Sequence, residues 1–557
     1  MTDSWRRLKN AGYRTRLYRY TLERNQIDRL VYLPQDPWPG DPDQANELFR
    51  GRYRFAGREA NAPNQPPWRL RPDDAEWQAA LHDFEWLRHF EAAGGAAALS
   101  QAKRLIRSWI DLCGDIDPVT WSPGVLGRRL TAWLVHGRFL LKGADSIFVD
   151  ADFGSMAAQW QHLQRVAGDA EFGSERFNAL VGLVYGAMAF PGREALIAKY
   201  LQQIERLMDQ TILPDGGYYS RAPSDLLAAL QQLIALRQAV EGRKAPVPDW
   251  LHSRISLMSP QLRGLRHGDG GLALFNGGHE AHHQKVDAVL KMTDGKDQLL
   301  LSAVQSGFQR LVAVKTILLA ETGAPPAGNL GQLAHSGGGG FELSIGKRRL
   351  VVNCGSGRYR SQEWREAARA TAAHSTLHIE NANAWPIGPD GAFGPQPAPM
   401  RCRRHEDDEG NAWLELGHDG YLKRFGLIHH RRLYLGASGK DIRGEDRLDA
   451  SGLQNKSAGK SADISAGAKG FEGDRAVVVR FHLHPEVQAS ALHGGGAVLL
   501  RLSDGQGWRF RANGAETALQ DSIYLGRTDS VRRSQQIVLS TTTSGDPTLI
   551  KWAFQRI

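Results

Sequence analysis

Apolar residues in the first half of the chain recur every three or four positions, which is the period of an amphipathic α-helix. This spacing runs from Asp73 to Leu251, and short Gly, Pro and Asp breakers divide it into separate stretches. The pattern predicts at least seven consecutive helices without an intervening strand. One representative series consists of Trp77, Leu81, Phe84, Leu87 and Phe90.

After Gly264, short β-branched and aromatic runs alternate with glycine-rich turns, which predicts an all-β region. A run of helices followed by a run of strands favours separate domains over a wound α/β fold. We therefore expect a helical domain over residues 1–255 and an antiparallel β-sandwich over residues 256–557. The predicted strands are Phe341–Ile345, Leu350–Asn353, Ser375–Ile379, Trp413–Leu416, Arg432–Leu435, Ala476–Leu483, Ala497–Leu502 and Gln536–Ser540.

Two polar stretches, Ala56–Pro67 and Leu453–Gly473, are rich in turn-forming residues and are expected to be connections.

The charge of the chain favours a polyanionic partner. Its 557 residues contain 69 Lys and Arg against 60 Asp and Glu, a formal charge of +9. The three cysteines form no CxxC pair, which argues against a disulfide framework or a thiolate zinc site. Motifs typical of nucleic-acid binding are absent from the sequence, so nucleic acid is not an expected partner. The first residues lack the pattern of an export signal, and no segment is apolar over the length of a membrane span, so we expect a cytoplasmic protein.

Polar residues that could bind a metal gather in the β region. His335 and His374, with Asn353 between them, offer the imidazole and oxygen donors that suit zinc. Hydrogen-bonded histidines in a glycine-rich hairpin would show the same spacing, and the spacing alone favours that alternative. The four glycines at 337–340 run into a predicted strand, which excludes a P-loop and indicates close approach of the backbone to a ligand or to another segment.

A turn between two predicted helices carries Tyr218, Tyr219 and Arg221, directly after Pro-Asp-Gly-Gly. A guanidinium beside a phenol favours the phenolate, which is what a tyrosine acting as general base requires. The alternative is a helix start at which Tyr218 packs on a neighbour.

Trp121, Arg128 and Arg129 form a third candidate group, for substrate binding. Tryptophan faces stack on sugar rings, and the guanidinium fork binds carboxylates or sulfates. Core packing explains Trp133 in the same stretch equally well.

Three motifs in the β region carry a family resemblance. They are Phe-Glu-Leu-Ser at 341–344, Leu-Val-Val-Asn-Cys-Gly at 350–355 and Arg-Ala-Thr-Ala-Ala-His-Ser-Thr at 369–376. Together they resemble the carboxy-terminal domain of the heparinase II/III family of polysaccharide lyases. The resemblance implies an incomplete (α/α) toroid followed by an antiparallel β-sandwich, and it implies the cell envelope or periplasm as the alternative location.

The resemblance also implies a zinc site. His335 matches the second histidine of the family's His-Gly-His motif, Asn353 matches an aspartate, and His374 matches a histidine that precedes asparagine. These are the family's zinc positions. Asn353 is a neutral replacement for a carboxylate, which weakens a site that must neutralise the charge of the metal.

The family's catalytic residues are matched less well. Its first histidine falls on Leu333, and its tyrosine falls nearer Asp225 than the two tyrosines of the Pro-Asp-Gly-Gly turn. Its Asn-His pair falls on residues 174–175, with Asn178 close by as the substrate-binding candidate.

The function implied by the resemblance is β-elimination of a uronate-containing polysaccharide, in a cleft between the toroid and the sandwich. Elimination needs a group that neutralises the carboxylate, a base for the C5 proton and an acid for the leaving O4. We assign the carboxylate to Arg221, Arg128 or Arg129, proton exchange to Tyr218 or Tyr219, and assistance or metal binding to His335 or His374.

Two other functions stay open. A glycoside hydrolase on the same scaffold would use paired carboxylates, for which the candidates are Asp215, Asp225, Glu175 and Glu342. A catalytically silent protein would bind acidic polysaccharide in a salt-dependent way without turnover.

Overall fold

The computed structural model describes the chain except for residues 1–8, 10, 24–26, 71, 73, 294–297, 359, 395–396, 450–473, 493–495 and 545–546. The chain divides into two compact units, one made of Met1–Thr211 with Gln231–Arg254 and the other of Ile212–Leu230 with Ile255–Ile557. The second unit thus includes a segment within the predicted helical domain. The segment Leu453–Gly473, predicted to be a loop, lies outside the described residues.

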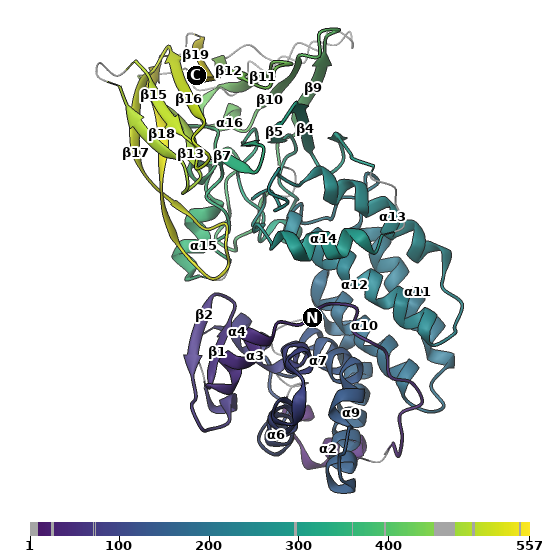
Figure 1. Cartoon of the computed structure of the whole chain (residues 1–557). Coiled ribbons are helices and arrows are strands. Elements are labelled where there is room, and N and C mark those ends of the chain that lie inside the picture. Colours follow the sequence, from purple (N-terminus) through teal and green to yellow (C-terminus); the bar gives the residue numbers. More distant parts are fainter. Residues whose placement is uncertain are drawn as a thin grey trace, which may run out of the picture. The chain divides into compact units, whose positions relative to one another are not determined.

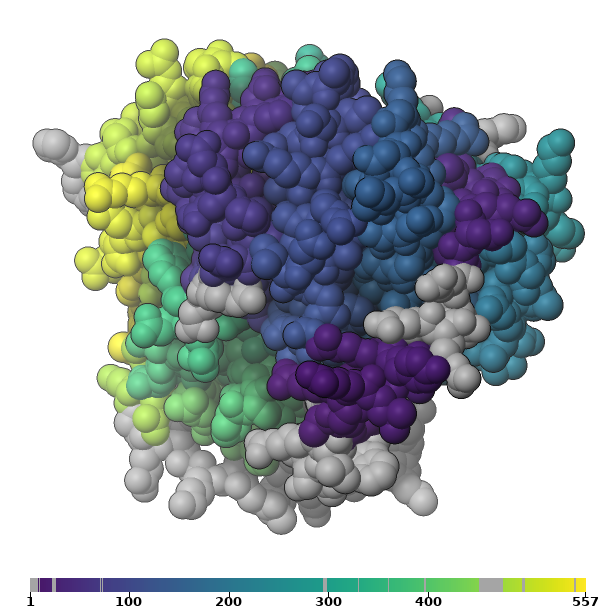
Figure 2. Space-filling model, turned by 90° about the horizontal axis from the view of Figure 1, so that it is seen from below, coloured from purple at the N-terminus to yellow at the C-terminus, as the bar shows by residue number. Residues whose placement is uncertain are grey.

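The first unit is built mainly of helices, as the periodicity predicts, and Figure 2 shows their outer surface, coloured from purple to blue. No helix in the described ranges is long and apolar enough to span a membrane. The helices are α2 (Arg16–Glu23), α3 (Pro42–Phe49), α4 (Ala75–His82), α5 (Leu87–Ala93), α6 (Gly95–Cys113), α7 (Pro123–Val135), α8 (Gly137–Leu140), α9 (Ser146–Val166), α10 (Ser174–Ala189) and α11 (Ala195–Thr211), while α12 (Pro223–Gly242) and α13 (Asp249–Gly264) contribute residues to both units.

The first unit also contains a hairpin that the sequence did not predict. Strands β1 (Arg52–Phe55) and β2 (Arg58–Asn61) pair antiparallel, so the prediction that Ala56–Pro67 is only a connection is wrong. Strand β2 reads Arg-Glu-Ala-Asn and has no apolar alternation to reveal it. Its backbone pairing and a cross-strand ion pair between Arg54 and Glu59, 2.8 Å, hold it instead.

Glycines allow helices α7 and α10 to pack closely. A side chain at Gly127 would come within 2.0 Å of the Asn178 carbonyl oxygen, and one at Gly182 within 2.5 Å of the Gly127 Cα. Only a residue without Cβ permits this backbone approach.

The second unit contains two large antiparallel sheets, which can be followed in Figure 1. All eight predicted strands are present, with ends that differ by a few residues. One sheet has the order β14 (Gln488–Ala491), β15 (Val498–Arg501), β16 (Gly507–Asn513), β19 (Thr548–Arg556), β12 (Asp441–Asp449), β11 (Ile428–Leu435), β10 (Ala412–His418) and β9 (Met400–Glu406). The other has the order β17 (Glu516–Tyr524), β18 (Arg532–Thr543), β13 (Arg475–Leu483), β7 (Arg348–Val352), β6 (Phe341–Ile345), β5 (Thr316–Glu321), β4 (Phe308–Ala313) and β3 (Ser302–Ala303), with β8 (Leu377–Ile379) paired to β13.

Short helices interrupt the strands of this unit. They were not predicted, because each is polar or too brief to show a helical period. They are α14 (His283–Lys291), α15 (Gln362–Arg369) and α16 (Leu422–Phe425), with the 3₁₀ turns η3 (Asn329–Gly331) and η4 (Thr371–Ala373).

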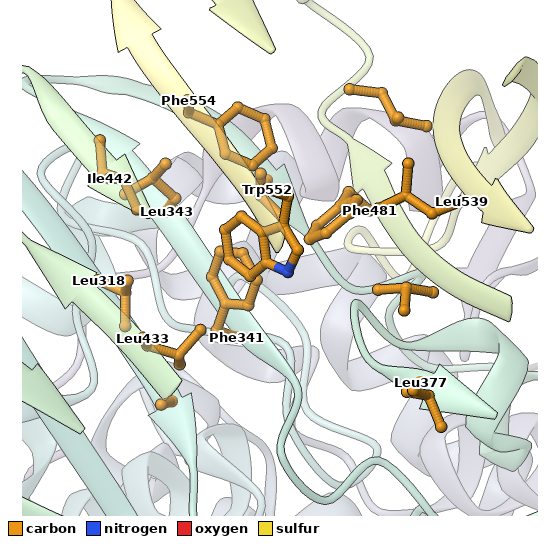
Figure 3. Packing of buried hydrophobic residues seen from close by; sticks show 14 of the residues in the cluster. Leu318, Phe341, Leu343, Leu377, Leu433, Ile442, Phe481, Leu539, Trp552 and Phe554 are labelled. Carbon is orange, nitrogen blue, oxygen red and sulfur yellow. The ribbon is translucent and has the colours of Figure 1, made fainter. Parts of the chain in front are cut away.

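The two sheets share one apolar core, in which alternate residues of the strands face one another. The ring of Phe341 in β6 stacks on that of Trp552 in β19, with centroids 5.5 Å apart, and Phe481 in β13 meets Trp552 edge-on at 4.8 Å (Figure 3). The predicted β-sandwich is therefore the architecture of this unit.

A buried ion pair on the adjacent strands β11 and β12 lies in this core. Arg431 donates to both carboxylate oxygens of Asp446, at 2.7 and 3.0 Å, and its remaining nitrogen donates to the carbonyl oxygens of Gly339 and Ser375, each at 2.8 Å. Asp446 also accepts hydrogen bonds from His429 and Trp552. The pair thus fixes the glycine-rich turn before β6 and the start of the segment that leads to β8.

Candidate functional site

Two buried histidines lie side by side between the glycine-rich turn and η4. The Nδ1 of His335 lies 3.1 Å from the Nε2 of His374. The Nδ1–H of His374 donates to the carbonyl oxygen of Ala370, 2.9 Å, which leaves its Nε2 as an acceptor. His335 therefore donates through Nδ1, and its Nε2 carries the lone pair. The described part of the chain provides no hydrogen-bond partner for that Nε2.

The glycine run has the role of close approach that the sequence predicts. A Cβ at Gly337 would lie 2.4 Å from the imidazole Cδ2 of His374, and a Cβ at Gly338 would lie 2.2 Å from the ring of Trp385. The absence of side chains at these two positions makes room for the histidine and the indole.

Asn353 is held by Glu342 rather than by the histidines. Its side-chain NH₂ donates to Oε1 of Glu342, 3.0 Å, and its Oδ1 accepts from the backbone N–H of Ser375, 3.0 Å. Glu342 Oε1 also accepts from the backbone N–H groups of Leu274 and Asn353, and its Oε2 accepts from His267 Nε2, 2.8 Å. An aspartate at 353 would place a second carboxylate against Glu342, whereas the amide of Asn353 donates to it.

These residues fit a zinc ion only in part. The His335 Nδ1 and the His374 Nε2 converge. The Ala370 carbonyl oxygen accepts from His374 Nδ1–H and so orients the ring, as hydrogen bonds commonly orient histidines that bind a metal. In the described ranges, however, no group of three or more His, Cys, Asp or Glu could hold a metal. With Asn353 committed to Glu342 and Ser375, the donor set falls short of what zinc prefers. Zinc binding stays a prediction, which elemental analysis of the purified protein tests.

Burial makes this pair a source of pH-dependent stability. Desolvation lowers the pKa of His374 to about 4 and that of His335 well below its usual range. An unfolded histidine titrates near about 6.5, so below that pH the unfolded state binds more protons and stability falls.

We expect His374→Gln to flatten this loss by up to about 1.4 kcal/mol per pH unit between pH 6.5 and 4. Urea unfolding of both proteins at several pH values in this range measures it. Parallel curves for the two proteins would contradict the assignment.

Arg221 does not have the surroundings expected of a carboxylate-binding residue. It is buried, and each nitrogen of its guanidinium donates to a protein group: Nε to the Ser306 carbonyl at 2.7 Å, Nη1 to the Ala324 carbonyl and Nη2 to Glu321 at 3.1 Å. The guanidinium therefore joins the turn at 214–221 to the end of β5, to the loop after it and to the turn before β4.

The expected activation of Tyr218 is also not found. Burial, together with nearby Tyr219 and Asp225, raises the pKa of Tyr218 well above its usual range, and Arg221 points elsewhere. A phenol of this kind keeps its proton, so Tyr218 does not suit the role of base. The Tyr219 ring, partly exposed, lies 4.9 Å from that of Tyr218.

Arg358, which has no assigned role in the sequence analysis, pairs near His335 with Asp225, one of the carboxylates considered for a hydrolase. Arg358 pairs with Asp225, 3.3 Å, and both side chains are partly exposed. The backbone N–H of Arg358 donates to the Ser356 hydroxyl. A Cβ at Gly277, which has φ of +78°, would lie 3.5 Å from Nε2 of His335 and 3.8 Å from that hydroxyl. The Nε2 of His335 and the segment that carries Ser356 and Arg358 thus both lie next to the turn at Gly277.

His279 belongs to these surroundings. Desolvation lowers its pKa to about 4, and Asp225 and Arg358 are among the charges that act on it. The sequence pointed to this group only through Asp225, as a candidate hydrolase carboxylate and as the residue nearest the family's tyrosine position.

In the first unit, Trp121 and Arg129 are core residues. Trp121 stacks on Trp109, with centroids 6.4 Å apart, and donates to the Cys113 carbonyl oxygen. Arg129 is fully buried over the Trp109 ring and bonds Gln159 and two carbonyl oxygens, and burial lowers its pKa to about 9. These contacts correspond to core packing, the alternative left open above.

Arg128 and Asn178 are bound to neighbouring side chains. Arg128 donates to Asp83 at 3.2 Å and to Glu175 at 3.3 Å. Asn178, at the close contact of α7 with α10, accepts a hydrogen bond from Gln232, 2.6 Å. Their part in substrate binding stays a prediction.

Among the carboxylates considered for a hydrolase, Asp215 and Glu342 are fixed in structural roles. Asp215 accepts from the backbone N–H groups of Gly217 and Ser306 and from the Ser306 hydroxyl. Glu342 is enclosed by the four donors described above. Glu342 is buried, and the oxygens of Asp215, which is partly exposed, are occupied by these donors.

A helical region followed by a two-sheet antiparallel sandwich matches the heparinase III-like fold. Residues 296–553 match the family described as heparinase II/III-like, C-terminal, and the chain belongs to the heparinase II/III-like family. FtsZ-localized protein C of Caulobacter vibrioides is 30% identical over 535 residues, which cover 92% of this chain and 87% of that protein.

Two solved structures show the fold. A crystal structure of heparinase III superposes with a TM-score of 0.71, at 12% identity, and covers 99% of this chain and 91% of that one. A heparan sulfate lyase mutant from Pedobacter heparinus gives 0.61 at 16% identity, covering 97% of this chain and 87% of that one. They confirm the expected fold class.

Proposed function

We propose that the protein acts on an acidic, uronate-containing polysaccharide by β-elimination, with His335 as the proton-transfer group. This proposal is supported mainly by the chain of hydrogen bonds that orients the histidine pair. Ala370 orients His374, His374 orients His335, and the lone pair of His335 Nε2 is left for another molecule. A base oriented by a second group is a recurring arrangement in catalysis.

Arg358 is the proposed carboxylate-binding residue, in place of Arg221. It is partly exposed, and it pairs with Asp225, a carboxylate that a uronate could displace. Neutralising the uronate carboxylate makes the C5 proton more acidic, so that a neutral imidazole can take it. Because its pKa is lowered, His335 is neutral at physiological pH. Tyr219, one of the two tyrosines expected to exchange a proton, is the proposed acid for O4.

A panel of acidic polysaccharides, incubated with the purified protein with and without chelator, tests this proposal. We expect new ultraviolet absorbance from unsaturated uronate ends. Arg358→Gln should lower kcat and raise KM together, because the guanidinium both binds the carboxylate and makes the C5 proton more acidic. Reducing ends without that absorbance would favour the hydrolase. A complete lack of product would reject both enzymatic functions.

A second candidate is a catalytically silent, polysaccharide-binding protein that works together with FtsZ. The similarity to FtsZ-localized protein C, together with Leu333 and Asp225 at the family's catalytic positions, supports it. It predicts co-sedimentation with FtsZ polymers without any turnover of glycan. It also predicts a cytoplasmic location, whereas a lyase acting on an outer glycan requires export, and cell fractionation separates the two.

A further inference from the structure

The outer face of the eight-stranded sheet carries a trough with a volume of about 480 Å³. It lies over β11, β12, β19 and β16, four adjacent strands. At its centre Ala553 pairs with Arg443 on one side and with Arg511 on the other. Strands are spaced by about 4.8 Å, so the two arginines start about 10 Å apart across a small residue. The depression exists because alanine separates two long side chains.

The lining of the trough is cationic. Arg432, Arg443, Arg511 and Lys551 line it, against one carboxylate, Glu445. Arg511 has no acidic partner among the described residues. The other cations pair only with exposed or half-exposed carboxylates, such as Lys551 with Glu445 at 3.7 Å. Exposed pairs of this kind are weak, so an anionic ligand can compete for the cations.

One aromatic ring completes the trough. Tyr434 pairs with Arg443 across the strands, and the guanidinium lies 5.8 Å from the centre of its ring. The Tyr434 hydroxyl donates to Asn411, 3.0 Å, which fixes the ring in place. An aromatic face beside arginine forks is suited to a sugar ring that carries an acidic group.

The position within the sheet favours a sugar over an acidic peptide. All four strands are interior, so their backbone N–H and C=O groups already pair with neighbouring strands. An extended peptide binds a sheet well by adding a strand at a free edge, which is not available here. A sugar needs only side-chain contacts, and hydroxyl groups can bond Asn513 and Glu445 at the side of the trough.

We propose that this trough binds an anionic sugar unit of a polysaccharide, at a site separate from His335 and without a part in bond cleavage. The ligand chemistry is a pyranose ring that carries carboxylate or sulfate. Binding here holds a chain on the sandwich whether or not the histidine site turns it over. The proposal therefore stands independently of β-elimination.

Calorimetric titration of the full chain with three tetrasaccharides tests the proposal: one derived from heparin, tetragalacturonate and neutral maltotetraose. We expect the two acidic sugars to bind and the neutral one not to bind. Binding by both shows that the carboxylate suffices, and binding by the heparin tetrasaccharide alone shows that sulfate is required. Affinity falls as salt is raised, because the contacts are ionic.

Variants in and beside the trough locate the site. Arg443→Gln and Arg511→Gln should each weaken binding about tenfold, as the loss of a charge-assisted contact implies. Ala553→Glu, which fills the centre with opposite charge, should abolish the binding that is due to the trough and leave binding at the His335 site. Arg403→Gln removes the same charge from β9 of the same sheet, outside the trough, and should leave binding unchanged.

Three results would overturn the proposal. They are equal affinity of all variants, no binding of either acidic sugar, or binding of a poly-glutamate peptide in preference to both sugars. Failure of the lyase assay is a different result, because the titration detects binding whether or not the sugar is cleaved. His335→Ala should bind the tetrasaccharides in the trough as the unmodified protein does.

Discussion

Asp446→Asn is expected to lower the free energy of unfolding by about 3–5 kcal/mol, the cost of leaving a buried charge without its partner. Arg431 would keep its guanidinium in the core between the two sheets without a carboxylate. Asp446 is stabilised in its charged form, since Arg431 and His429 hold its pKa well below the usual range despite burial. Urea unfolding, followed by circular dichroism, measures the change.

Glu415→Gln is the matched control for this prediction. Glu415 pairs with Arg432 at 2.8 Å on the outer face of the same sheet, where both side chains are exposed. Exposed pairs contribute about 0–1 kcal/mol, so this variant should unfold almost like the unmodified protein. If the two variants lost equal free energy of unfolding, the buried pair would contribute no more to stability than the exposed one.

His335→Ala is expected to reduce eliminative turnover by about 10²–10⁴-fold, the usual contribution of a positioned acid–base group. The fall should be in kcat rather than in KM, because the imidazole acts on the proton and not on the carboxylate. The initial rate of absorbance increase at saturating polysaccharide measures it.

His378→Ala is the control for that result. It is another buried histidine of the second unit, in β8, and its Nε2 accepts a hydrogen bond from Arg480, 3.1 Å. This variant should retain turnover, and both variants should keep the circular dichroism of the unmodified protein. Undiminished turnover in folded His335→Ala would remove the proposed function of the pair.

Sequence patterns located the elements of the fold well where apolar residues alternate. Strand β13 alternates buried and partly exposed residues over most of its length, strand β6 is buried throughout, and both were predicted. Strand β2 was not, because its residues are polar and its stability comes from pairing. The period of apolar residues shows which face of a helix or strand is buried. It gives no signal for an element that buries neither face.

The candidate site was less accessible from sequence for a different reason. His335 and His374 could be grouped because motifs flank both. The hydrogen-bond partners of Arg221 could not be predicted, because they lie 85 to 103 residues further along the chain. Likewise, the composition that suggested sugar binding at Trp121 is the composition of a core, and only burial separates the two.

The position of β19 bears on the order in which the sandwich assembles. This strand follows all the others in the chain, yet it pairs with β12 on one side and β16 on the other. During synthesis, β9–β12 and β14–β16 emerge earlier and remain two half-sheets with unpaired inner edges until β19 arrives. Trp552 and Phe554 arrive with it, so the apolar core stays incomplete until then. We therefore expect those edges to be the aggregation-prone part of the nascent β domain.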